Sequence, residues 1–179
     1  MVDENLYIRR ATTDDAQLLS VLSAETFFDT FHDTCTREDI DGFIQTYFNP
    51  EQVEKELQDP EDFYFIAFVN GHAAGYIRMK EDESELIEIT KQKSIELKRI
   101  YVSKNYQGHK IGAKLMTFAL DFASEKTYEL VWLGVWEHND KARAFYKKFG
   151  FRDTGHTHPF PIGNTQQTDN WMVRSIEKR

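Results

Sequence analysis

The C-terminal half of the chain alternates strand and helix patterns, and this alternation constrains the fold more than any other feature of the sequence. Residues 94–102 and 128–136 are rich in β-branched and aromatic side chains, as strands are, and residues 110–125 between them carry apolar side chains at helical spacing. Strands joined through a helix pair in parallel, and the helix covers the sheet. A helix over 140–149 that ends at Gly150 and strands over 151–160 and 168–176 are expected to follow.

The N-terminal half adds helices and one hairpin. The dipeptide Asn70-Gly71 between two apolar runs favours a tight hairpin turn. The charged stretch 80–93 is expected to be a surface insertion or a long hairpin tip. The other expected elements are a strand over 7–11, helices that end near Phe31 and cover 37–48 and 51–57, and strands over 63–69 and 73–79.

These patterns predict a single domain over residues 1–179, because the length suits one domain and no repeat or linker interrupts it. Strands and helices alternate in one half and cluster in the other. The predicted class is therefore α/β or α+β with a mixed sheet.

The net charge and the cysteine content limit which classes of ligand and which cellular compartment we expect. The chain has 22 Lys and Arg against 30 Asp and Glu, a net charge of −8, which disfavours nucleic acid and suits a cationic substrate. Cys35 is the single cysteine, so no internal disulfide can form. The N-terminus shows no basic region followed by an apolar run, and no window is apolar enough to span a membrane. A cytoplasmic protein without membrane contact is expected.

The turn after residue 102 is the strongest candidate site. A strand ends there, Gly108 and Gly112 follow, and a helix begins near Lys110. Free backbone N–H groups and the positive end of the helix dipole make such a turn suitable for a phosphate or pyrophosphate. A plain strand-to-helix turn, with the glycines needed for local geometry, explains this segment equally well.

Two motifs resemble those of the GNAT superfamily of N-acetyltransferases. Gln107 and Gly112 match the first and last positions of its Gln/Arg-x-x-Gly-x-Gly/Ala motif, whereas Lys110 stands where a glycine is usual. The segment 139–151 is similar to the family's second motif, which ends in Lys-x-Gly-Phe. Segments 25–31, 132–137 and 167–169 resemble the PaiA-type spermidine/spermine acetyltransferases of bacteria, so the resemblance covers nearly the whole chain.

The resemblance implies a fold and a cofactor. The implied sheet has seven mostly antiparallel strands that splay apart between the fourth and fifth, and acetyl-CoA lies in the gap. Lys110 leaves the N–H groups of this turn available only in a backbone conformation allowed to L-residues, as the first position of a helix permits. The residues implied to hold acetyl-CoA are Ile100, Tyr101, Val102, Gln107, Gly108, His109, Lys110, Ile111, Gly112, Ala113, Asn139 and Lys148. Asn139 also suits a simple helix N-cap.

The resemblance further implies direct transfer of the acetyl group to an amine. Tyr146 holds the position from which a hydroxyl supports the leaving thiolate, although a core aromatic would also suit that helix. Glu96 is the expected base, and regular strand alternation would place Glu96, Lys98, Ile100 and Val102 on one face. A surface glutamate, with the proton lost to water, is the alternative.

The implied acceptor is a polyamine, and a homodimer is possible within the family. Glu25, Phe28, Asp29 and Phe31 are the candidate acceptor residues, because a carboxylate beside aromatics suits a flexible cation. An ordinary amphipathic helix would show the same pattern. Two rival functions stay open: acetylation of a protein N-terminus or another small amine, and non-catalytic binding of an acyl-CoA. His156 and His158 have no third ligand nearby, so no metal site is expected.

Overall fold

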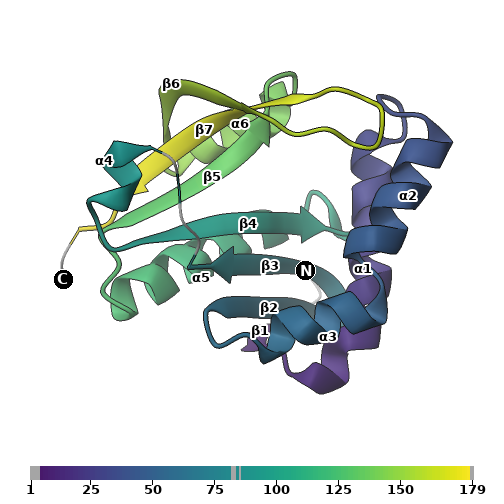
Figure 1. The fold of residues 1–179 in the computed structure, drawn as a ribbon. Helices are drawn as coiled ribbons and strands as arrows, with labels where there is room; N and C mark the ends of the chain where they lie inside the picture. Colours follow the sequence, from purple (N-terminus) through teal and green to yellow (C-terminus); the bar gives the residue numbers. More distant parts are fainter. Residues whose placement is uncertain (1–4, 82–83, 85, 178–179) are drawn as a thin grey trace.

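The computed structural model describes residues 5–81, 84 and 86–177, and these residues form a single mixed sheet with helices on both faces (Figure 1). The strand order is β1-β2-β3-β4-β5-β7-β6, and all neighbours are antiparallel except β4 and β5. The strands are β1 (Leu6–Arg10), β2 (Asp62–Val69), β3 (His72–Lys80), β4 (Ser94–Val102), β5 (Leu130–Trp136), β6 (Arg152–Pro159) and β7 (Thr168–Ser175).

The helices divide between the two faces of the sheet. One face carries α5 and α6, and their side chains pack with the apolar residues of β4 and β5 in the largest core cluster. The other face carries α1 and α3, which pack on β2 and β3. The helices are α1 (Ala16–Phe31), α2 (Arg37–Tyr47), α3 (Pro50–Gln58), α4 (Ile87–Thr90), α5 (Ile111–Glu125) and α6 (Asp140–Lys148).

The expected hairpin is confirmed between β2 and β3. Asn70 and Gly71 have φ angles of 51° and 83°, the two left-handed residues that a type I′ turn requires. Residues 1–4, which belong to the N-terminal segment expected to contain no signal peptide, lie outside the described residues. No helix among the described residues has the length and apolar character needed to cross a membrane.

The expected splay between the fourth and fifth strands is also confirmed. The parallel pairing covers only residues 94–96 of β4 and 130–132 of β5. Beyond Glu96 and Trp132 the strands diverge, as Figure 1 shows. The last six residues of β4 therefore have a paired edge toward β3 and an edge toward β5 without a ladder.

A bulge in β4 corrects the expected strand alternation. Arg78 pairs with Arg99 and Met79 with Leu97, so Lys98 is the extra residue. Leu97 and Ile100 consequently face the α5 side, and Glu96 lies on the opposite face with Arg99. The predicted common face of Glu96, Lys98, Ile100 and Val102 is wrong, because a bulge reverses the alternation after it.

The segment 80–93 is also more than a surface insertion. Part of it lies outside the described residues, but α4 inserts Ile89 into a buried cluster with Trp132 and Trp171. Ile89 has no exposed surface. This short helix covers one end of the β5–β7 face and leaves the remainder of that face to the cleft.

Candidate active site

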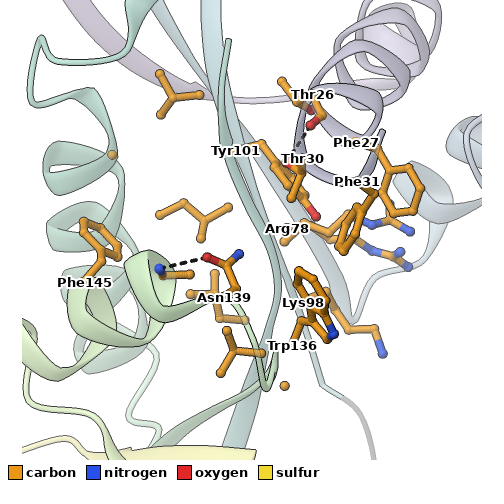
Figure 2. Close-up of a pocket in the computed structure, with 18 of the residues that line it drawn as sticks. Thr26, Phe27, Thr30, Phe31, Arg78, Lys98, Tyr101, Trp136, Asn139 and Phe145 are labelled. Carbon is orange, nitrogen blue, oxygen red and sulfur yellow. Dashed lines mark hydrogen bonds between the residues drawn. The ribbon is translucent and has the colours of Figure 1, made fainter. Parts of the chain in front are cut away.

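The cleft between β4 and β5 is a cavity of about 1250 Å³. Its walls come from opposite faces of the sheet, and Figure 2 shows Phe27 and Phe31 of α1 on one side with Asn139 and Phe145 on the other. We call the residues 100–102, 107–108, 110–113 and Asn139 the cofactor wall. We call Phe31, Glu96, Trp136, Asp169 and Trp171 the acceptor wall.

The cofactor wall is built from backbone groups. The β5-facing edge of residues 100–102 is unpaired in the sheet, and α5 begins directly beyond the following turn. The first helical hydrogen bond runs from the Lys114 N–H to the Lys110 carbonyl, so the N–H groups of residues 111–113 have no acceptor within the helix. The Gln107 side-chain amide donates to the Val102 carbonyl at 3.4 Å and holds the turn against the strand end. These features fit an extended amide-bearing chain that ends in a pyrophosphate.

Lys110 explains how this chain manages without the usual glycine. Its backbone is left-handed, with φ 61° and ψ 14°, at the N-cap of α5. Lys110 is therefore the N-cap of α5 and not the first helical residue that was expected. The turn needs the conformation that glycine adopts freely, and lysine adopts it at a cost of about 1–2 kcal/mol.

Asn139 performs the capping role and also lines the cavity. Its side-chain oxygen accepts from the Ala142 N–H at 3.1 Å, as the dashed line in Figure 2 shows. The capping bond uses the oxygen, and the amide N–H₂ group remains as a donor at the cavity wall. Ten of the twelve implied cofactor residues line the cavity. His109 and Lys148 are exposed and lie outside its wall.

Tyr146 lies on α6 and reaches the cavity between the two walls. Burial and the charge of Asp169 raise the pKa of its hydroxyl well above the ordinary value of 10. The hydroxyl is therefore neutral near pH 7 and can donate to a developing thiolate. The role of Tyr146 as acid and the role of Glu96 as base stay predictions.

The acceptor wall combines aromatic rings with carboxylates on one face of β5 and β7. Trp136 pairs with Asp169, and Gly134 pairs with Trp171, so these side chains share that face. The ring of Phe31 lies 6.2 Å from that of Trp136 and joins α1 to the same wall. Glu96 closes the wall from β4, with its carboxylate 2.9 Å from the Lys98 ammonium.

The Asp169 carboxyl group has a strongly raised pKa. It is 9% exposed, and burial followed by the negative charge of Glu96 raises its pKa to about 7. Its carboxylate lies over Gly134, where a Cβ atom would be 3.1 Å from Oδ2. Segment 167–169 resembles the PaiA-type enzymes, but sequence reasoning assigned Asp169 no role, since only the strand pairing brings its side chain into the cleft.

The candidate acceptor residues on α1 divide into two pairs. Asp29 and Phe31 line the cavity, whereas Glu25 and Phe28 do not. Glu25 is exposed to solvent. The Phe28 ring packs outside the cavity, against His32 and beneath the Arg37 guanidinium. Helical periodicity turns these two positions away from the face that carries Phe27 and Phe31.

A loop between β6 and β7 covers the acceptor end of the cleft. Phe160 and Pro161 of this loop line the cavity. Asp39 of α2 accepts from the Asn164 N–H at 2.9 Å and from the Thr165 hydroxyl at 2.7 Å, and these bonds hold the pKa of its carboxyl below the ordinary value. The loop is thereby tied to α2, as Figure 1 shows near the upper end of that helix.

Two arginines lie deeper in the same end of the cleft. Arg78 binds Asp62 at 2.6 Å and Glu56 at 3.1 Å, and its side chain is 6% exposed. Arg99 donates to the Tyr64 hydroxyl at 2.9 Å and lies over the Phe48 ring. Most of this charge is compensated inside the protein. Within the residues that the structure describes, no group of His, Cys, Asp and Glu side chains is arranged to hold a metal ion.

Comparison with known proteins gives consistent matches. The sequence model of the acetyltransferase (GNAT) family matches residues 22–151. An uncharacterised N-acetyltransferase in the pepI 3′ region of Lactobacillus delbrueckii subsp. lactis is 34% identical over 155 residues, which is 87% of this chain and 88% of that protein.

Two solved structures share the fold over nearly the full length. The PaiA N-acetyltransferase of Thermoplasma acidophilum in complex with coenzyme A has a TM-score of 0.77 at 21% identity, with 96% of this chain and 99% of that chain covered. The ribosomal-protein-S18-alanine N-acetyltransferase of Escherichia coli has a TM-score of 0.70 at 17% identity, with 97% and 96% covered.

Proposed function

The chain belongs to the acetyltransferase (GNAT) family and is an acetyl-CoA-dependent N-acetyltransferase, and from this premise we propose that its acceptor is a cationic primary amine of the polyamine class. The observation that carries the proposal is the acceptor wall. It combines the Glu96 and Asp169 carboxylates with the rings of Phe31, Trp136 and Trp171 in one cavity. Carboxylates pair with ammonium groups, and aromatic faces attract them through cation–π interactions.

The division of the cleft supports direct transfer. The pantetheine arm would lie along residues 100–102, with its pyrophosphate at the N–H groups of residues 111–113. The thioester would then lie beside Tyr146, between the cofactor wall and the acceptor wall. The amine attacks the thioester carbonyl, the carbon–sulfur bond breaks, and the Tyr146 hydroxyl donates to the departing thiolate.

The net charge of −8 supports the same acceptor, because it attracts a polycation toward the protein. The similarity to a PaiA N-acetyltransferase adds support from the fold. We further propose that the protein works in the cytoplasm on a small molecule, without nucleic acid or membrane as partner. A homodimer is part of this proposal only by analogy with the family.

A protein N-terminus is the second candidate acceptor. Arg99 lines the cavity, and its guanidinium could donate a hydrogen bond to the carbonyl oxygen of a bound peptide. One similar structure is that of a ribosomal-protein-S18-alanine N-acetyltransferase.

The test is the release of free CoA thiol from acetyl-CoA with spermidine, spermine and an alanine-starting peptide as separate acceptors, with the product mass as confirmation. Release with the polyamines and a mass increase of one acetyl group are expected. Release only with the peptide would replace the proposed acceptor and keep the enzyme class.

A further inference from the structure

Asp169 and Glu96 are two carboxylates that face one cavity, yet their surroundings differ. The Glu96 carboxylate lies 2.9 Å from the Lys98 ammonium, which stabilises its ionised, proton-free form. Asp169 is 9% exposed, and no hydrogen bond from a described residue contributes to its pKa of about 7. A carboxylate that lacks such a partner binds a proton more readily, so Asp169 is the better proton acceptor of the two.

Gly134 makes room for Asp169 to reach the cleft. Asp169 belongs to β7, which is separated from the gap by β5. Its carboxylate crosses above Gly134, and a Cβ there would lie 3.1 Å from Oδ2 and 3.5 Å from the Asp169 Cβ. Any larger residue at position 134 would displace the carboxylate, so the glycine directs Asp169 toward the gap where the thioester is expected.

Asp169 is also electrostatically coupled to Tyr146, which lines the same cavity from α6. Its charge contributes to the raised pKa of Tyr146 on α6 and of Tyr101 on β4. Acyl transfer to an amine needs a proton acceptor for the amine and a hydroxyl donor for the leaving thiolate, and Asp169 and Tyr146 supply one of each in the same cavity.

We propose that Asp169 is the catalytic base of the reaction and takes a proton from the ammonium group of the acceptor. This inference rests on the proposed function, since it assigns a role within the same cleft. Glu96 then acts as a positioning residue, because its charge tunes Asp169 and attracts the acceptor.

The proton balance follows from this assignment. The ammonium N–H bond breaks and an O–H bond forms on Asp169, which leaves a neutral amine. The amine lone pair forms the new C–N bond, and the carbon–sulfur bond breaks. The second proton of the nitrogen passes to the CoA thiolate by way of the Tyr146 hydroxyl. Asp169 returns its proton to solvent, so the products are the N-acetyl amine, CoA thiol and one proton.

The charged and titratable groups around Asp169 determine the pH at which its carboxyl group loses its proton. Glu96 from β4 raises its pKa, and Lys98 pairs with Glu96. Tyr146 from α6 and Tyr101 from β4 are neutral near pH 7. His158 from β6 is its cross-strand neighbour. The acid limb of kcat/KM is therefore expected near the pH at which Asp169 loses its proton.

The test is the pH profile of kcat/KM for the wild type, Asp169→Asn and Glu96→Gln, with exposed Asp14→Asn as the matched control. The wild type and the control should show an acid limb near pH 7. Asp169→Asn should lower kcat/KM by about 10²–10³-fold and remove the limb. Glu96→Gln should keep the limb and move it to lower pH, because a neighbouring negative charge is lost. The proposal would be overturned if the acid limb of kcat/KM were lost in Glu96→Gln and only shifted in pH in Asp169→Asn.

Two readouts separate this proposal from a folding defect and from the choice of acceptor. Acetyl-CoA affinity should stay within about 2-fold in every variant, because none belongs to the cofactor wall. Gly134→Ala should lower kcat/KM without loss of acetyl-CoA affinity, since it displaces the Asp169 carboxylate.

A carbon-13 NMR titration of the aspartate carboxyls needs no acceptor. A resonance that titrates near pH 7 in the wild type and is missing in Asp169→Asn supports the proposal. Titration of all aspartates below pH 5 would overturn it even if the polyamine is acetylated. Failure to acetylate any polyamine would instead refute the proposed acceptor, and the titration would still test the raised pKa that the role of Asp169 needs.

Discussion

The two walls of the cleft recognise their partners by different means. The proposed cofactor wall offers a free strand edge and the start of α5, so apart from the Asn139 amide its groups are backbone atoms within a short stretch of sequence. The acceptor wall uses side chains from α1, β4, β5 and β7 that meet only in the folded protein. Backbone recognition tolerates changes of side chain, as Lys110 shows, whereas the acceptor wall depends on individual residues.

Tyr146 lies where the walls meet, and its replacement gives the largest expected effect. Tyr146→Phe should lower kcat by about 10²–10³-fold, because the hydroxyl that donates to the thiolate is lost. Acetyl-CoA affinity, measured by calorimetry, should change less than about 3-fold. Equal losses in turnover and affinity would mean that Tyr146 belongs to the cofactor wall, and the division of roles would fail.

Asp169 gives the sharpest stability test of the acceptor wall. Its folded pKa of about 7 exceeds the ordinary value of 3.8, so the native state holds a proton that the unfolded state releases between these values. Wild-type stability should therefore fall as pH rises from about 4 to 7, and Asp169→Asn should lack this loss. The free energy of unfolding of Asp169→Asn, relative to that of the wild type, should rise by on the order of 3 kcal/mol between pH 4 and pH 8.

Denaturant unfolding at the two pH values measures this difference. Asp14→Asn is the control, because Asp14 is exposed and should follow the wild type. If the difference in free energy of unfolding between Asp169→Asn and the wild type is the same at both pH values, the pKa of the Asp169 carboxyl is not raised in the folded protein.

Substitution of Gly75 tests whether the close packing of β3 against the end of β4 is needed for the cofactor wall. A Cβ at this position would lie 2.6 Å from the Tyr101 carbonyl oxygen and 3.2 Å from the Val102 Cα. Gly75→Ala should therefore push the end of β4 away from β3 and lower the free energy of unfolding by about 2 kcal/mol. Acetyl-CoA affinity should fall as well. Gly42→Ala, with no atom within 4 Å of the new Cβ, is the matched control and should not destabilise.

Lys110→Gly gives the smallest effect and two changes of opposite sign. Removal of the left-handed strain should stabilise the fold by about 1 kcal/mol, after the larger chain entropy of glycine is subtracted. Loss of the ammonium beside the pyrophosphate position should weaken acetyl-CoA binding several-fold. The KM of the acceptor should not change, and a changed value would show that the walls are coupled.

The same contrast explains what the sequence could predict. The splay between β4 and β5 was predictable from the resemblance to the GNAT superfamily, and the turn before α5 was predictable from the glycines of one short motif. The face of Glu96 was not, because the bulge at Lys98 depends on pairing with Arg78 and Met79. Asp169, although it lies in a segment that carries the resemblance, was given no role for a similar reason, since its place above Gly134 follows from strand order rather than from sequence spacing.

The left-handed backbone of Lys110 could be suspected from the sequence only as a departure from a glycine position. The burial of Ile89 was likewise hidden, because the charged residues around it suggested an exposed insertion. In each case tertiary contacts, rather than local propensity, decide the outcome.

The most direct test of the two-wall account is a crystal structure with a bisubstrate conjugate that joins CoA to spermidine through an acetyl linker. The account predicts the pantetheine along residues 100–102, the pyrophosphate at residues 111–113, and the polyamine over Gly134 between Asp169 and Trp136. A polyamine directed away from this face, with the CoA part in place, would contradict the acceptor wall and the role proposed for Asp169.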